Sequence, residues 1–200
     1  MIYKRLILLF IFMFFFTSYW GCTRIINVNI DNIGNLPIPL IEPLPLIAGV
    51  YYGNDFRTYK ISQTKDTDPV VTLFYNAQLG KANIALFDYI LSNLFEKVIP
   101  VQYLPNGNKE IENIDIIIEP TVDYYNPLMC LRYEIIFYLP NGKKISWMIS
   151  GTVEDAPIIL TSNTAKKHAQ IAMRDVAAKF MTGFCNQEDI QKYFYKQCNR

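Results

Sequence analysis

The chain has 200 residues, of which 51% are hydrophobic, and its 19 basic and 18 acidic residues give a net charge of +1 at pH 7. Nucleic-acid-binding proteins carry a basic surplus on one surface, so this balance argues against a nucleic-acid partner. The roughly 150 residues that follow the N-terminal segments suffice for one domain with a substantial hydrophobic core.

The first 21 residues have the pattern of a secretory signal peptide. Lys4 and Arg5 precede an uninterrupted apolar run from Leu6 to Phe16, and small or aromatic residues follow up to Gly21. A charged start, an apolar core of about 7–15 residues and a small residue at the cleavage site are typical of such signals. The run is shorter than the ~20 residues that span a bilayer. We therefore predict a signal peptide over residues 1–21, with an uncleaved anchor as the alternative.

The Gly21-Cys22 step resembles the lipobox of bacterial lipoproteins. The resemblance implies that Cys22 carries acyl chains, such as palmitate, and that cleavage just before it makes Cys22 the first residue of the mature protein. Two or more acyl chains give stable attachment to a membrane. In this family an Asp after the cysteine favours the inner membrane, and Thr23 stands there instead. The resemblance thus implies a bacterial envelope protein, anchored in the outer membrane and facing the periplasm.

Loss of Lys4 and Arg5 with the signal peptide leaves 17 basic residues against 18 acidic ones in the mature chain, a net charge of about −1.

Residues 22–46 have the composition of a tether. Prolines then recur at nearly alternate positions: Pro37, Pro39, Pro43 and Pro45. This spacing favours extended polyproline geometry, which makes a semi-rigid spacer. Ile26, Val28 and Ile30 alternate with polar residues as in a half-buried strand, so packing of this part on the domain or on a partner stays open.

Residues 47–200 are predicted to form a single periplasmic domain that begins with strands and a helix. "LIAGVYYG" suggests a buried strand ending at Gly53, and "DPVVTLFY" a second or edge strand starting after Pro69. Helical periodicity follows from Lys81 to Phe95. Its apolar side is wide and includes Leu86, Phe87, Tyr89, Ile90 and Leu91. Such a helix must be covered on more than one side. Either the sheet and the tether cover it, or this side is a partner-binding or ligand-binding face.

The middle of the chain is predicted to be antiparallel sheet. One strand carries apolar residues on one face: Ile114, Ile116, Ile118 and Val122. The segments from Leu131 to Leu139 and from Ile145 to Val153 alternate apolar and polar residues, as in a hairpin with one buried face. Their connection, "YLPNGKK", has Pro and Gly at the positions that turns require. A near copy, "YLPNGNK", occurs from Tyr103 to Lys109 and indicates a second turn.

Two helices close the chain. The longer one is expected from Asn163 or Thr164 to Met181, with Ser162, Asn163 or Thr164 as the N-cap and Gly183 just after its end. An apolar stripe runs along it: Ala165, Ala169, Ala172, Val176 and Phe180. A short helix follows from about Glu188 to Tyr195. The predicted fold class is therefore α+β, a mostly antiparallel sheet with two main helices packed on it, plus a short C-terminal helix.

The sequence offers no catalytic constellation. His168 is the only histidine, no serine lies in a G-x-S-x-G motif, and neither a metal-ligand cluster nor a phosphate-binding glycine loop is present. Asp115, Glu119 and Asp123 would point the same way along one strand, but about 13 Å apart, beyond the 5–9.5 Å of glycosidase pairs. We therefore expect no enzyme, no metal and no cofactor, with these carboxylates on a solvated face.

Three cysteines remain after Cys22, so one pair can close in an oxidising periplasm. Cys185 and Cys198 are nearest in sequence. A continuous helix between them would separate its ends by about 12 Å, whereas a disulfide needs Cα atoms within about 7 Å. A folded-back tail would permit this pair, which stays a possible disulfide, and Cys130 would then be free.

Two functions from different classes remain. "GVYYGNDFR" and "AMRDVAAKFMTGF" resemble stretches of uncharacterised proteobacterial envelope lipoproteins, and this resemblance implies no activity. The first function is a non-catalytic binding or scaffold component of a periplasmic or outer-membrane complex, with an envelope protein as partner. The second is a lipid or amphiphile carrier with an apolar groove under the helix from Lys81 to Phe95. A large pocket there favours the carrier, and a flat exposed apolar patch favours the scaffold.

Overall fold

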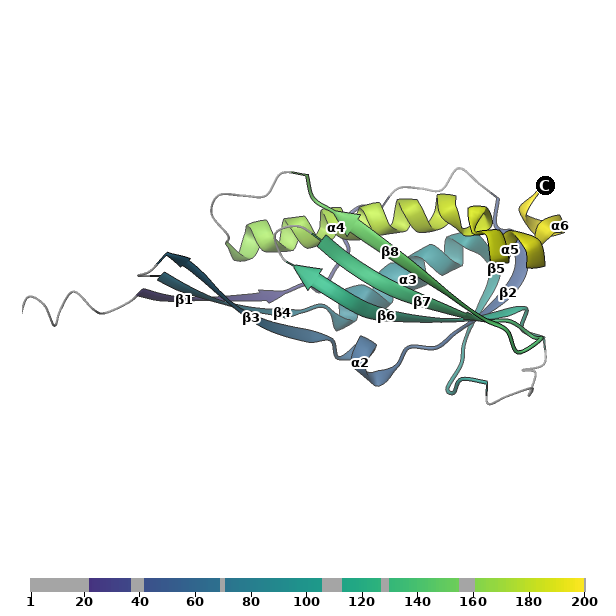
Figure 1. Cartoon of the computed structure of the whole chain (residues 1–200), viewed down its shortest axis with the longest axis horizontal. Helices are drawn as coiled ribbons and strands as arrows, with labels where there is room; N and C mark the ends of the chain where they lie inside the picture. Colours follow the sequence, from purple (N-terminus) through teal and green to yellow (C-terminus); the bar gives the residue numbers. More distant parts are fainter. Residues whose placement is uncertain are drawn as a thin grey trace, which may run out of the picture.

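The computed structural model describes residues 22–36, 42–68, 71–105, 113–126, 130–154 and 161–199, so the predicted signal peptide lies outside the described part. Within these ranges the chain forms two sheets and five α-helices, of which two are long. The α+β class, the two main helices and a short C-terminal helix are confirmed. The molecule is elongated, with β1 at one end and the C-terminal helices at the other (Figure 1).

The smaller sheet has three strands in the order β1-β4-β3. β1 (Cys22–Asn29) runs parallel to β4 (Val71–Gln78), and β3 (Lys60–Asp68) runs antiparallel to β4. β4 is therefore the central strand of this sheet, so the strand predicted after Pro69 is confirmed and its alternative as an edge strand is wrong. The sequence analysis missed β3, because its many polar residues leave little apolar alternation.

The larger sheet has five strands in the order β5-β2-β6-β7-β8. Its members are β2 (Leu44–Val50), β5 (Phe95–Pro100), β6 (Ile116–Asn126), β7 (Cys130–Tyr138) and β8 (Lys144–Thr152). β2 is parallel to β5 and to β6, whereas the β6–β7 and β7–β8 pairs are antiparallel. Both sheets are thus mixed, which corrects the expectation of one mostly antiparallel sheet. The parallel pairing arises because a helix leads directly into β5 and returns the chain beside β2.

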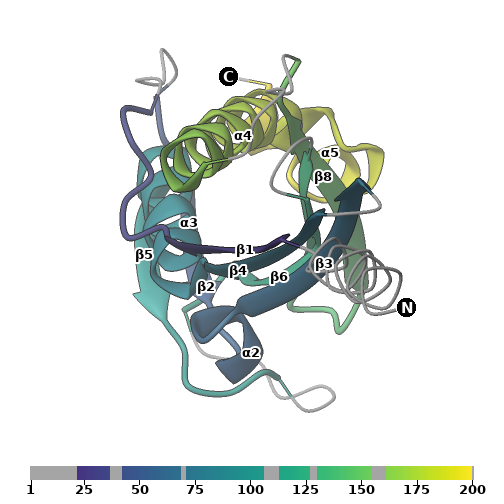
Figure 2. The same ribbon diagram turned by 90° about the vertical axis from the view of Figure 1, so that its left-hand side faces the viewer.

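The long helices are α3 (Gly80–Leu94) and α4 (Ser162–Gly183), and they lie side by side with the strands curving around them (Figure 2). Four shorter elements complete the fold: α2 (Asn54–Arg57), the 3-10 turn η1 (Phe184–Asn186), α5 (Glu188–Tyr193) and α6 (Tyr195–Cys198). None of the helices in the described part is long and apolar enough to cross a membrane.

The segment predicted as a tether is largely part of the domain. Residues 22–29 are strand β1, and Ile26, Val28 and Ile30 are buried in the core, as their alternation with polar residues suggested. Further on, Arg174 of α4 donates through Nε to the carbonyl of Asn35 (3.1 Å). The prolines at 37 and 39 lie outside the described residues, and Pro45 belongs to β2. Residues 22–36 therefore do not form a free spacer.

The hairpin of β7 and β8 has the predicted turn. Gly142 has a φ of 78°, and its N–H donates to the carbonyl of Leu139 (2.9 Å). Only glycine adopts this left-handed backbone without strain. The near copy of this turn falls mostly within residues 106–112, outside the described part.

Helix α4 starts at Ser162, one residue before the earliest predicted start, and its N-cap lies one residue before the earliest predicted N-cap. Thr161 is the N-cap, and its side chain and that of Thr164 form a capping box. The stripe from Ala165 to Phe180 is buried, as expected. At Gly151 of β8 the helix and the strand touch, because a Cβ atom there would lie 1.8 Å from the carbonyl oxygen of Ala172. Glycine therefore sets the distance between α4 and the sheet.

We predict that Gly151→Ala lowers the free energy of unfolding by about 3 kcal/mol, because α4 must shift to admit the methyl group. Urea denaturation measures this loss. Gly53→Ala is the matched control, since its Cβ would meet nothing closer than 3.8 Å. Equal stability of the two variants would contradict the close approach.

Candidate functional site

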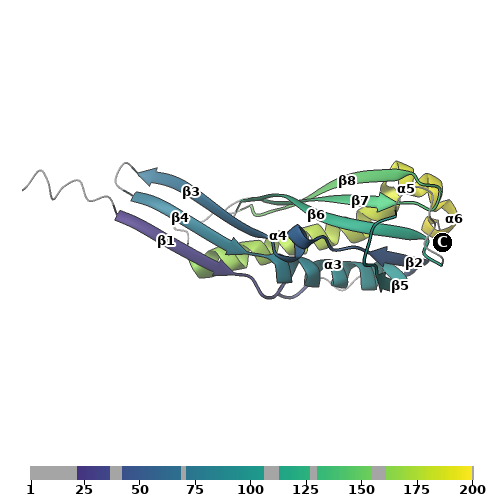
Figure 3. The same ribbon diagram turned by 90° about the horizontal axis from the view of Figure 1, so that it is seen from below.

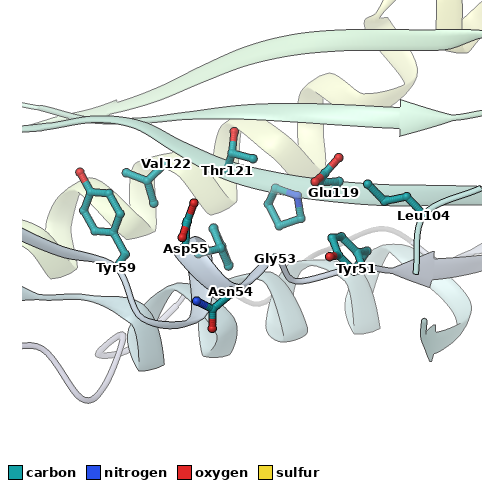
Figure 4. Close-up of a pocket in the computed structure, with 11 residues that line it drawn as sticks. Tyr51, Gly53, Asn54, Asp55, Tyr59, Leu104, Glu119, Thr121 and Val122 are labelled. Atoms are coloured by element: carbon teal, nitrogen blue, oxygen red, sulfur yellow. The ribbon is translucent and has the colours of Figure 1, made fainter. Parts of the chain in front are cut away.

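A cleft opens where strand β2 leaves its neighbour β6. The two strands pair only from Ala48–Val50 to Ile116–Ile118, and the last hydrogen bond runs from Tyr51 N to the carbonyl of Ile118 (3.0 Å). The chain then turns into α2 and enters the other sheet, while β6 continues to Asn126. The strands diverge and leave a cleft of about 480 Å³ (Figure 4).

The cleft is built from three parts of the chain. The segment after β2 contributes Tyr51, Gly53, Asn54, Asp55, Phe56 and Tyr59; β6 contributes Glu119, Pro120, Thr121 and Val122; and Leu104 follows β5. Its floor is fixed, because the buried Phe56 ring stacks on Tyr52 (5.5 Å between centroids) and contacts Phe87 (5.7 Å). The site is therefore anchored directly to the aromatic core.

Two carboxylates give the cleft a negative charge. Glu119 accepts a hydrogen bond from the Tyr138 hydroxyl (2.6 Å), and burial together with this bond raises the pKa of Tyr138. In the described part of the chain, neither Asp55 nor Glu119 has a cation within 4 Å. Arg57 is close to Asp55 in sequence, but its Nε donates to the carbonyl of Tyr52 (2.8 Å). Among the described residues, neither carboxylate is therefore neutralised by a cation.

Two of the three aromatic residues that line the cleft are tyrosines, and the third is Phe56 of its floor. Tyr51 and Tyr59 lie towards its two ends (Figure 4). Burial, and secondly the nearby Asp123 carboxylate, raise the pKa of Tyr59, so this ring carries no charge at neutral pH. Neutral aromatic faces next to carboxylates attract cations, and they also pack against apolar chain. The lining is therefore suited to binding a cation or apolar chain.

The one histidine does not belong to the cleft. His168 is half-buried on α4, and its Nδ1 has no hydrogen-bond partner among the described residues. Over the same ranges, no group of three His, Cys, Asp or Glu side chains could hold a metal ion.

The predicted partner or ligand face on α3 is covered within the fold. Four of its residues are fully buried: Leu86, Phe87, Ile90 and Leu91. Tyr89 is half-buried. The space between α3 and the sheet is filled by rings, since Phe87 contacts both Tyr133 (5.1 Å) and Phe180 (6.1 Å). The groove that a carrier would need under this helix is therefore occupied by side chains.

The three carboxylates of the predicted row have separate partners. Asp115 accepts from the backbone N–H of Ile47 (2.7 Å), Glu119 accepts from Tyr138, and Asp123 forms an ion pair with Arg132. A bulge before Tyr124 also breaks the regular alternation of β6. Of these three carboxylates, only Glu119 lines the cleft. No local sequence pattern links Glu119 to Asp55, because only the topology of the chain brings both to the same cleft.

The C-terminal cysteines are joined. Cys185 and Cys198 form a disulfide with Cα atoms 5.4 Å apart. The predicted helix from Glu188 to Tyr195 is broken, because Phe194 leaves helical geometry (ψ 35°) between α5 and α6. This break folds the tail back and removes the 12 Å separation of a continuous helix. Cys130 is free and half-buried, and Cys22 is the first residue of β1.

The comparisons with known proteins give a fold and no activity. No family model matches the chain, and no curated protein matches it. A crystal structure of protein XCC0632 from Xanthomonas campestris, of the family DUF330, is similar with a TM-score of 0.50 at 10% identity, over 86% of this chain and 99% of that one. A second structure, of an uncharacterised protein, has a TM-score of 0.37 at 11% identity, over 80% and 98%. The first likeness shows a shared fold and agrees with the expected resemblance to uncharacterised proteobacterial proteins.

We predict that Cys198→Ser lowers the free energy of unfolding by about 3 kcal/mol. The reason is that the disulfide closes a loop between two cysteines that are 13 positions apart in the sequence. Thermal unfolding monitored by circular dichroism measures the change. Cys130→Ser serves as the control and should leave the stability within about 0.5 kcal/mol. A loss of the same size in both variants would mean that cysteine packing, and not the cross-link, is responsible.

Proposed function

We propose that this protein is a lipid-anchored lipoprotein of the bacterial envelope, held in the outer membrane and facing the periplasm. We propose further that it acts without catalysis, as a binding or scaffold component of a periplasmic or outer-membrane complex. The observation that carries the binding role is the cleft, which combines two carboxylates and tyrosine rings on a floor tied to the core. Within the described ranges of the chain, neither carboxylate has a partner cation.

The position of Cys22 supports the anchor. The residue begins β1, directly opposite Val71 at the start of β4, so acyl chains on it would leave from the end of the three-stranded sheet. Ile25 and Phe74 face each other in register close to that end and are 62% and 40% exposed. Exposed apolar pairs of this kind suit a position next to a membrane surface. Without a free spacer, the anchor would hold the domain close to the bilayer.

The cleft would remain accessible in that arrangement. The three-stranded sheet forms one end of the molecule, and the elements around the cleft lie further along the long axis (Figures 1 and 3). A protein partner could therefore reach the cleft from the side. Transport of an amphiphile gains no support, because aromatic side chains fill the space under α3.

We predict that the membrane-extracted protein lacks residues 1–21 and carries acyl chains on Cys22. Intact-mass spectrometry of the wild type and of Cys22→Ser measures both changes. The substitution should abolish acylation and cleavage together, because the lipobox reaction requires the thiol. An unlipidated wild-type mass would contradict the anchor.

Blue-native electrophoresis of the same extract tests the scaffold role. The lipidated protein should migrate in a complex larger than the monomer. Migration of all the lipidated protein as a monomer would count against a stable complex and leave the anchor unaffected.

A further inference from the structure

Strand β6 has an open edge along the cleft. β7 pairs with β6 from Ile117 to Asn126, but β2 covers the other edge only as far as Ile118. Among the described residues, no strand pairs with that edge from Glu119 to Val122. Unpaired edges are templates for a further strand. The cleft is therefore bounded by backbone that can form a ladder.

The backbone groups that face the cleft follow from the alternation along a strand. The carbonyl of Ile118 points towards β2, because it accepts from Tyr51 N. Successive residues point their backbone groups to opposite sides, so the carbonyl of Pro120 and both backbone groups of Val122 face the cleft. Proline lacks an N–H, which makes this edge a poor template for unselective pairing. Two acceptors and one donor remain for an incoming segment.

The side chains around this edge select the charge of that segment. Asp55 and Tyr51 lie on the segment after β2, and Glu119 lies on β6 at the opposite side of the cleft (Figure 4). A Lys or Arg side chain can form charge-assisted hydrogen bonds with the carboxylates, and the tyrosine faces favour the same cation. An acidic side chain would meet repulsion here.

We propose that the cleft binds an extended segment of a partner protein, which adds as a short strand to the edge of β6 from Glu119 to Val122 and places a Lys or Arg side chain between Asp55 and Glu119. Main-chain hydrogen bonds give affinity in this type of recognition, and side-chain pockets give specificity. Four residues of such a strand span about 13 Å. This inference rests on the proposed binding function and names the chemistry of its partner.

The test uses a fluorescein-labelled peptide, acetyl-Thr-Val-Thr-Lys-Thr-Val-Thr-amide, and the full chain extracted in mild detergent, with binding measured by fluorescence anisotropy. A peptide with norleucine in place of lysine should bind roughly tenfold more weakly, because it keeps the length and loses the charge. Glu119→Gln and Asp55→Asn should each weaken binding of the lysine peptide by about five- to tenfold.

Glu134→Gln is the matched control for Glu119→Gln. Glu134 lies on the neighbouring strand β7 and also accepts from a hydroxyl, that of Ser146 (2.7 Å), but it does not line the cleft. Binding should be unchanged in this variant. A glutamine at 119 can still accept from Tyr138, and circular dichroism checks that each variant is folded. Equal losses in the two glutamine variants would overturn the placement of the cation.

Two N-methylated peptides test the strand pairing itself. Alternate N–H groups of an added strand point towards β6, and the others point away. Methylation of one alternate set should therefore abolish binding, and methylation of the other set should leave it within about threefold of the parent. If both peptides bind equally well, or if the parent peptide does not bind at all, strand addition is overturned.

These outcomes are separable from failure of the proposed function. A native complex that persists in lipidated Glu119→Gln, together with no peptide binding, would reject the cleft as the partner site and keep the scaffold role. If the intact mass of the wild-type protein shows no acyl chains and this protein still binds the peptide, the anchor is rejected and the cleft is kept as the partner site.

Discussion

The architecture depends on the fact that strand β6 is longer than the strand beside it. β2 pairs with only the first part of β6, up to Ile118, because the chain turns away after Val50. At the other end of β6 the three-stranded sheet is attached through Tyr125. Its carbonyl accepts from Gln63 of β3 (3.1 Å), and its hydroxyl bonds that of Tyr75 of β4 (3.0 Å). The cleft lies between these two attachments.

The attachment of the three-stranded sheet through Tyr125 is rigid. Tyr75 and Tyr125 are 3% and 1% exposed, so each hydroxyl relies on the other for its hydrogen bond. A buried hydroxyl without a partner costs about 1–3 kcal/mol, which penalises any separation of the two rings. Burial raises the pKa of Tyr75 to about 12 and that of Tyr125 further, so both hydroxyls keep their protons at neutral pH. A cleft held at both ends needs little reorganisation on binding, and preorganisation of this kind favours affinity.

Patterns among neighbouring residues in the sequence predicted some of the helices and strands and missed others. The α3 and α4 helices and the β7–β8 hairpin followed from periodicity and turn chemistry, because their signals lie within the elements themselves. Strands β3 and β5 were missed, since β3 is polar and β5 is short and charged. The four prolines suggested a tether, although the alternation of Ile26, Val28 and Ile30 pointed to the buried strand that is present. The cleft could not be predicted, because only the divergence of β2 from β6 brings Asp55 and Glu119 to the walls of one cleft.

The course of β6 connects the proposed anchor with the proposed partner. β6 runs along the long axis of the molecule towards the end that carries β1 (Figure 1). A segment added to its edge would follow the same axis. If acyl chains on Cys22 hold that end at a membrane, the bound segment runs along the line between the membrane and the far end of the domain. Such a geometry suits a partner whose chain extends through the periplasm towards the membrane, and it suits less well a partner that lies flat on the bilayer.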